Sequence, residues 1–216
     1  MSHERNEGRP EVTQSTDGSG PEESLATAVR EEFGFRRMVC ACRKCSLWCE
    51  YVPGALVPSD LDRLIPSGDD PLDWAKDHLL ASPGFRRMDA YGRIVVQIPT
   101  LVPKRQENGF CHWLEDGLCL IHDNSPFGCA FFSQCQQTAE QAELRNIAAR
   151  QARARAFQEG HLYSQIWGRL WDAGVRELTT QENLHRGLRE LERLDNAEER
   201  PERNAQRKAK RKAKKK

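Results

Sequence analysis

The chain has 216 residues, of which 38% are hydrophobic and 30% charged, and its formal net charge is +1. This composition supports one domain with extensions, or two small ones, and excludes a core that extends over the whole chain. The last ten residues, 207–216, carry eight Lys or Arg and no acid, so the other 206 residues sum to −7. No stretch approaches the roughly twenty apolar residues of a membrane span. Because the N-terminus also lacks the apolar run of a signal sequence, we expect a cytoplasmic protein without a membrane partner.

The first part of the chain combines a polar segment with short helices. Residues 1–24 are rich in Gly, Ser, Pro and Glu, which predicts a disordered N-terminal segment. A short helix is predicted over residues 25–32. Ser59 with Asp62 three residues later is typical of a helix N-terminus. Another helix is predicted to begin at Pro71 and to end near residues 82–84.

The middle of the chain has the composition of β-structure. Residues 92–98 are rich in β-branched side chains, which predicts a strand. A hairpin is predicted over residues 111–122, with its turn at Glu115-Asp116-Gly117.

The length of this hairpin loop decides where its two cysteines point. A two-residue loop would place Cys111 and Cys119 on opposite faces, because side chains alternate along a strand. A three-residue loop pairs Trp113 with Cys119 and places both cysteines on one face. The three-residue loop is therefore required if both cysteines bind one metal.

The residues after the last cysteine have helical character. Residues 136–157 predict a helix whose N-terminus is a capping box of Thr138 and Gln141. Apolar side chains recur at helical spacing over residues 162–170 and again over residues 184–194, and we interpret both stripes as core packing.

These elements predict an α+β fold. We expect a small metal-stapled cysteine-cluster domain, with a β-hairpin and short helices, over residues 25–136. A helical region over residues 137–196 is expected to pack on it, and a basic disordered tail to follow over residues 197–216.

The eight cysteines form two groups separated by about sixty residues without cysteine. In a reduced compartment such clustering favours metal binding over disulfides. The alternative is that they are small buried apolar side chains. The first group is Cys40, Cys42, Cys45 and Cys49, and the second is Cys111, Cys119, Cys129 and Cys135.

The spacing of the first group suits a helix. Cys42, Cys45 and Cys49 lie at positions i, i+3 and i+7, which share one helix face. Cys40 lies off that face and needs a non-helical start. Four cysteine thiolates suit both zinc and an iron–sulfur cluster, so the metal stays open.

The second group lies in a recognisable pattern of short motifs. Their order and spacing resemble the second half of a zinc- or iron-chelating cysteine-cluster family of the CxxCxxCC type. That family shows a cysteine with an aromatic-leucine pair, then Gly-x-Cys-x-Ile-Tyr, then Arg-Pro-x-x-Cys-Arg-x-Phe. The resemblance covers roughly residues 40–135 and includes a helix like the one expected at Ser59. The motifs are Cys111-His-Trp-Leu114, Gly117-Leu-Cys119-Leu-Ile-His122 and Ser125-Pro-Phe-Gly-Cys129-Ala-Phe131.

The chain departs from this family at four positions. Trp48 stands where the family has the first cysteine of its Cys-Cys pair, and His122 replaces the tyrosine. Ser125 and Ala130 replace the two arginines. Cys40 is a candidate replacement for the thiol missing at Trp48, and His122 is a further candidate ligand.

The resemblance implies metal chelation through both cysteine groups. The second-tier candidates are Cys40 and Cys135. The primary candidates are Cys42, Cys45, Cys49, Cys111, Cys119 and Cys129. Zinc would make the site structural, whereas an iron–sulfur cluster would allow redox roles.

Two other functions follow from different features. Some relatives in that family resemble flagellin lysine N-methylases, which would make the protein a cluster-dependent modifying enzyme. No catalytic residue can be named for such an activity, because no glycine-rich strand–turn–helix for a nucleotide-type cofactor is present. The tail Arg207–Lys216 is basic enough for non-specific, salt-sensitive contact with nucleic acid. It is equally consistent with a solvated tail.

Overall fold

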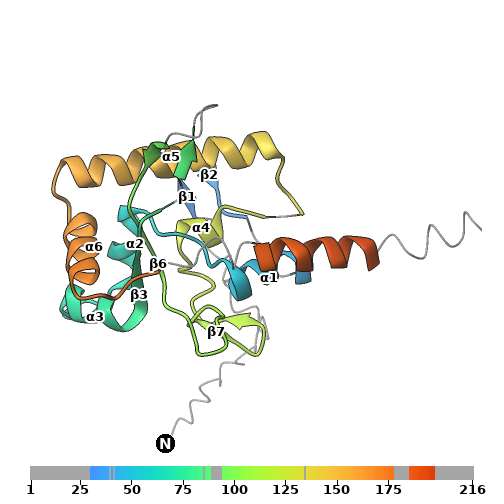
Figure 1. The fold of residues 1–216 in the computed structure, drawn as a ribbon, viewed down its shortest axis with the longest axis horizontal. Coiled ribbons are helices and arrows are strands. Elements are labelled where there is room, and N and C mark those ends of the chain that lie inside the picture. Colours follow the sequence, from blue (N-terminus) through green and yellow to red (C-terminus); the bar gives the residue numbers. More distant parts are fainter. Residues whose placement is uncertain are drawn as a thin grey trace, which may run out of the picture.

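A computed structural model describes residues 30–38, 40, 42–84, 86–88, 94–133, 135–177 and 185–197. The predicted disordered segment 1–24 and the basic residues Arg207–Lys216 lie outside this described part. Within it, six labelled helices and a further helix at 185–197 accompany four two-stranded antiparallel sheets. The predicted α+β class is therefore confirmed (Figure 1).

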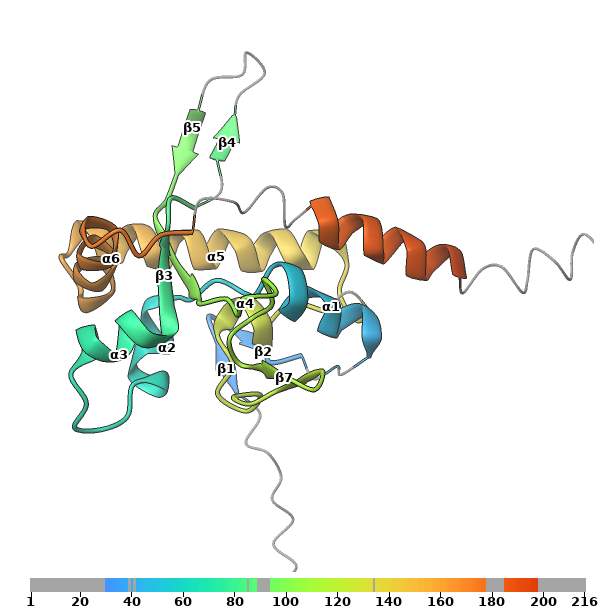
Figure 2. The same ribbon diagram turned by 60° about the horizontal axis from the view of Figure 1, so that its bottom comes forward.

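The elements are short, apart from two helices in the second half of the chain. The helices are α1 (Arg43–Tyr51), α2 (Pro58–Leu64), α3 (Pro71–His78), α4 (Phe127–Ala130), α5 (Ala139–Gln158) and α6 (Leu162–Asp172). The strands pair as β1 (Glu31–Glu32) with β2 (Phe35–Arg36), β3 (Leu79–Ser82) with β6 (Thr100–Pro103), β4 (Arg86–Met88) with β5 (Ile94–Gln97), and β7 (Leu114–Glu115) with β8 (Leu118–Cys119). Figure 2 shows the paired strands β4 and β5 projecting from the rest of the fold.

The main core lies between α2, α3, α6 and the β3–β6 pair. Tyr163 of α6 is fully buried, and its hydroxyl donates to the Leu56 carbonyl at 3.1 Å while accepting from the Leu101 N–H at 2.8 Å. Ile166 and Leu170 are also buried, so the apolar stripe predicted over residues 162–170 is confirmed as core packing. The helical C-terminal half is thus packed into the same core as the middle of the chain.

A second core cluster surrounds α4 and contains a buried carboxylate. Asp60 of α2 has no exposed surface. Its carboxylate accepts from the Val57 N–H at 2.7 Å and from the Phe127 N–H at 3.0 Å, and it pairs with Arg30 at 2.9 Å. Arg63 completes the group. Asp60 therefore joins the start of the described chain, α2 and α4.

Three predicted helix boundaries were wrong for identifiable reasons. α2 begins at Pro58, and Asp60 rather than Asp62 binds the N-terminal backbone, because Asp60 points into the core. α3 begins at Pro71 as predicted but ends at His78, because residues 79–82 pair with β6. Glu31–Glu32 is a strand paired with β2 and not the end of a helix over 25–32. Residues 25–29 of that prediction lie outside the described part.

The predicted strand and the long helix are confirmed. β5 occupies Ile94–Gln97 within the strand expected over 92–98. α5 has Thr138 as its N-cap, with the Thr138 hydroxyl accepting from the Gln141 N–H and the Gln141 side chain accepting from the Thr138 N–H. Local capping signals were sufficient here because they act within one turn.

The helix at 185–197 lies beside α1, as Figure 1 shows at the right of the molecule. Lys44 of α1 pairs with Asp195 at 2.7 Å. A Cβ added at Gly187 would lie 3.1 Å from the Tyr51 Cβ, so the two helices approach closely there. Residue 184 of the stripe predicted over 184–194 lies outside the described part, and the rest of the stripe is not fully core, because Leu188 is 45% exposed.

None of the helices that the structure describes has the length and apolar character needed to cross a membrane.

Candidate metal centre

The first residues of α1 place two cysteines side by side. Cys42 is the N-cap and has extended backbone angles, φ −68° and ψ 159°. Its carbonyl accepts from the N–H groups of Cys45 and Ser46, each at 3.0 Å. This cap fixes Cys42 and Cys45 at the same end of the helix, three residues apart, where i and i+3 side chains are neighbours.

Cys40 and Cys135 reach this helix end from two other segments. The Met38 N–H donates to the carbonyl of Ala130 in α4 at 2.8 Å, which holds the chain just before Cys40. Cys135 lies in the turn before α5. The Ser133 hydroxyl shapes this turn, since it accepts from the Cys135 N–H at 3.3 Å.

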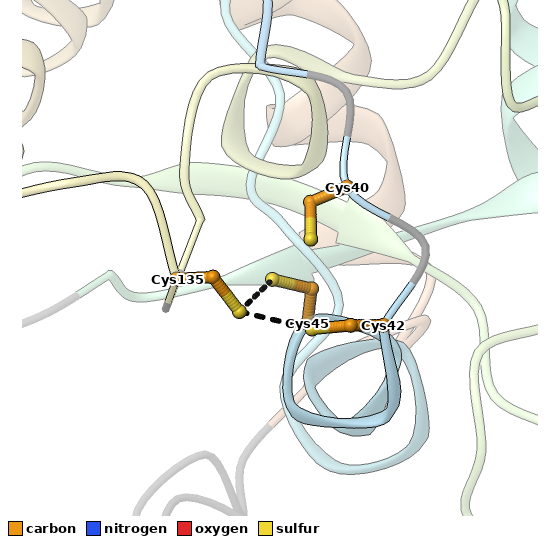
Figure 3. Close-up of side chains that lie close together, drawn as sticks. All are labelled: Cys40, Cys42, Cys45 and Cys135. Carbon is orange, nitrogen blue, oxygen red and sulfur yellow. Dashed lines mark hydrogen bonds between the residues drawn. The ribbon is translucent and has the colours of Figure 1, made fainter.

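The four side chains point toward one another (Figure 3). The sulfur atoms of Cys40, Cys42, Cys45 and Cys135 all lie within 4.8 Å of one another. The Sγ atom of Cys135 is 2.9 Å from that of Cys42 and 3.6 Å from that of Cys45. A tetrahedral zinc site with Zn–S bonds of about 2.3 Å holds its sulfurs roughly 3.8 Å apart. The donor set therefore suits one metal ion, with the Cys45–Cys135 distance close to the zinc spacing and the Cys42–Cys135 distance shorter than it.

The centre lies at the surface, and two of its thiol groups share a proton through a hydrogen bond. Cys42 and Cys135 are exposed, and Cys40 and Cys45 are half-buried. A hydrogen bond from Cys135 lowers the pKa of the Cys42 thiol to about 6, and the same bond raises the pKa of Cys135. Cys42 is therefore a thiolate at neutral pH even without a metal, which is the form that binds metals.

Alkylation of the metal-free protein is expected to be selective for Cys42. Because its lowered pKa is about 6, the rate at Cys42 should rise with pH through 6 and level off above it, whereas Cys135 should react slowly at pH 7. Timed iodoacetamide labelling followed by peptide mass spectrometry measures both rates. Equal rates at the two residues, or a Cys42 rate still rising at pH 9, would contradict the proton sharing between them.

The other four cysteines lie outside this group. Cys49 is further along α1, Cys111 forms an isolated β-bridge with Arg105, Cys119 ends β8 and Cys129 is in α4. α1 thus brings Cys42 and Cys45 together with Cys40 and Cys135, the two residues assigned to the second tier. Cys49 is about one helical turn beyond Cys45, and its carbonyl accepts from the Cys111 N–H at 2.9 Å. All eight cysteines are free thiols.

The hairpin has the two-residue loop rather than the three-residue one. Leu114 pairs with Cys119 and Glu115 with Leu118, which leaves Asp116 and Gly117 as the loop. Both loop residues have positive φ, 48° and 78°, as a tight hairpin turn of this kind requires. The opposite-face argument nevertheless does not apply, because Cys111 is not part of β7. It forms an isolated β-bridge with Arg105, and a turn at residues 112–113 separates it from the strand.

His122 lies outside the centre, whereas Ser133 lies beside it. His122 is exposed and is not among the residues grouped as metal ligands in the described chain. Ser133 was not singled out from the sequence, yet its hydroxyl lies 3.4 Å from the Cys45 sulfur. Its spacing of two residues before Cys135 is the only local signal that could have identified it.

Comparisons with known proteins give no identity for this chain. No family model matches it, and no curated protein or solved structure is significantly similar. The resemblance to the cysteine-cluster family remains a prediction, and the case for a function depends on the geometry of the centre.

Proposed function

We propose that the protein is a metal-binding protein in which Cys40, Cys42, Cys45 and Cys135 hold one zinc ion as a structural centre. The observation that carries the proposal is the approach of four sulfurs, from two segments far apart in the chain, to within 4.8 Å of one another. Free cysteines that only fill space in a core are buried. Two of these four are exposed instead, so packing alone does not account for their meeting.

The separation of the sulfurs supports zinc over a four-iron cluster. Four thiolates in a closed tetrahedral set are typical of structural zinc. An iron–sulfur cluster also takes four cysteines, but its iron and sulfide atoms lie between them and keep the cysteine sulfurs farther apart. The contact between Cys135 and Cys45, 3.6 Å, is close to the spacing around a single ion.

A metal at this centre would connect parts of the fold that are far apart in the sequence. Cys45 and Cys135 are 90 residues apart in the sequence. The four ligands would join the start of α1 to the turn before α5, while Ser133 holds Cys135 in place. When bound, the ion supplies the positive charge that allows several thiolates to lie together. This arrangement supports a structural function, in which the metal holds the start of α1 against the turn before α5.

Elemental analysis of protein purified without chelators tests this proposal. We expect zinc in the wild type, and one equivalent less in Cys135→Ser and in Cys42→Ser. Ser46→Ala, which changes a side chain of α1 next to Cys45, should keep the wild-type content. A brown protein containing iron and sulfide would show that the centre holds an iron–sulfur cluster instead of zinc. A folded wild type without metal, or full zinc content in both cysteine variants, would refute the centre.

A further inference from the structure

The four remaining cysteines lie in α1, in the isolated bridge at Cys111, in β8 and in α4, and backbone contacts connect these segments. Cys49 lies in the second half of α1, and its carbonyl is bonded to the Cys111 N–H at 2.9 Å. The Cys111 carbonyl in turn accepts from the Leu114 N–H at 2.9 Å. Leu114 is the partner of Cys119 in the hairpin. A continuous path of backbone contacts therefore connects Cys49, Cys111 and Cys119.

Cys129 is brought to the same place by two glycines. A Cβ on Gly54 would lie 2.0 Å from the Gly128 carbonyl carbon and 2.2 Å from the Cys129 nitrogen. A Cβ on Gly128 would lie 2.4 Å from the Ala55 nitrogen. Only glycine permits such an approach of two backbones. The segment after α1 therefore packs directly on α4 at the position of Cys129.

Backbone N–H groups point at three of these four sulfurs. The Gly54 N–H donates to the Cys129 sulfur at 3.2 Å. The backbone N–H groups of Trp113 and Ile121 act in the same direction at Cys111 and Cys119, where each opposes the rise that burial causes in the thiol pKa. Such hydrogen bonds favour the thiolate over the neutral thiol. They also resemble the outer hydrogen bonds that orient metal ligands and tune the metal. Cysteines that act only as apolar side chains have no need of them.

Among the described residues only Cys40, Cys42, Cys45 and Cys135 are grouped at metal-ligand distance, so these four sulfurs lie farther apart, yet close enough for charge on one to affect the others. Charge on Cys49, Cys111 or Cys119 would disfavour charge on Cys129, and the same holds between the members of each other pair. Burial raises the pKa of Cys49 to about 12 and that of Cys111 to about 11. A bound cation would stabilise all four thiolates together.

A buried arginine adds positive charge at the same place. The Arg37 side chain is only 4% exposed. It donates to the backbone carbonyls of His122 and Asp123, just after β8, and favours the thiolate of Cys119. An ion bound by four thiolates carries net negative charge when the ion is divalent, and Arg37 would offset part of it.

We propose that Cys49, Cys111, Cys119 and Cys129 form a second site for a soft divalent metal ion such as zinc, separate from the centre at Cys40, Cys42, Cys45 and Cys135. The two sites would be neighbours, because Cys45 and Cys49 are about one turn apart on α1. The inference does not depend on the first centre, since the two sets share no ligand. In this arrangement the start of α1 supplies Cys42 and Cys45 to one site, and its second half supplies Cys49 to the other.

Zinc content measured on single and double variants tests the second site. The wild type, expressed in zinc-supplemented medium, is expected to hold two zinc ions by elemental analysis and native mass spectrometry. Cys119→Ser and Cys129→Ser should each hold one, Cys135→Ser should also hold one, and the Cys119→Ser/Cys135→Ser double variant should hold none. Leu118→Ser is the matched control, because Leu118 is next to Cys119 but 70% exposed, and it should keep both ions.

Two outcomes would overturn the inference. Cys119→Ser and Cys129→Ser could keep the full wild-type zinc, which would make these four residues plain thiols. A wild type that holds only one zinc, lost completely in Cys119→Ser and also in Cys135→Ser, would mean one shared site. Loss of zinc in Cys119→Ser but not in Cys135→Ser would refute the first centre and leave the second standing. Cadmium-113 NMR of the cadmium-loaded wild type, where two signals are expected, decides the matter without a variant that might fail to fold.

Discussion

Replacing Cys135 with serine is expected to lower the melting temperature of the metal-loaded protein by roughly 8–16 °C and to leave that of the chelated protein almost unchanged. A ligand present at a thousand times its dissociation constant stabilises a fold by about 4 kcal/mol. In a domain of 150–250 residues each kcal/mol corresponds to about 2–4 °C. Cys135 is exposed, and its side chain contacts are with the sulfurs of Cys42 and Cys45. Its loss should therefore matter only when a metal joins them.

Calorimetry of four samples separates these contributions. Wild type and Cys135→Ser are compared with zinc and again after chelation, so that any second metal site is emptied in both proteins alike. An equally large drop with and without metal would show that Cys135 acts through packing. No drop in either condition would contradict a structural role for the centre.

Replacing Asp60 with alanine is expected to destabilise the fold by about 3–5 kcal/mol, because it removes one partner of a buried ion pair and leaves the others unpaired. The Asp60 carboxylate has no exposed surface and binds two backbone N–H groups, at Val57 and Phe127, in addition to Arg30 and Arg63. Removing it leaves buried donors without an acceptor. Urea denaturation of the variant, with metal present, measures the loss.

Two variants make the Asp60 result specific. Asp62→Ala changes an exposed residue of the same helix and should alter stability by no more than about 0.5 kcal/mol. Asp60→Asn retains an oxygen for the backbone N–H groups but not the charge, so its loss should lie between those of the two alanine variants. Similar stabilities for Asp60→Ala and Asp62→Ala would show that the network does not hold α2 to α4.

Both predictions concern contacts between segments that are remote in the sequence. The metal centre and the buried Asp60 network have this in common. Asp60 reaches Phe127 across 67 residues, and Cys42 reaches Cys135 across 93. Each joins the first half of the chain to the segment around α4 and α5. The metal centre and the buried carboxylate therefore support the same junction from its exposed side and from its interior.

The sequence by itself determined the features that are set within one or two turns. Thr138 and Gln141 identified the start of α5, Asp116 and Gly117 identified the hairpin turn, and Pro71 identified the start of α3. The α+β class followed from these local signals. They are reliable because a cap or a tight turn is stabilised by neighbours in the chain.

Only the tertiary structure decided how the eight cysteines are divided. Helical periodicity placed Cys49 on one face with Cys42 and Cys45, but the structure groups those two with Cys40 and Cys135. The Cys49 backbone is bonded instead to Cys111. Spacing along the chain gives the direction of a side chain and not what lies in that direction. Segments that fold back from as far as 93 residues away supply the partners, through packing that no short motif encodes.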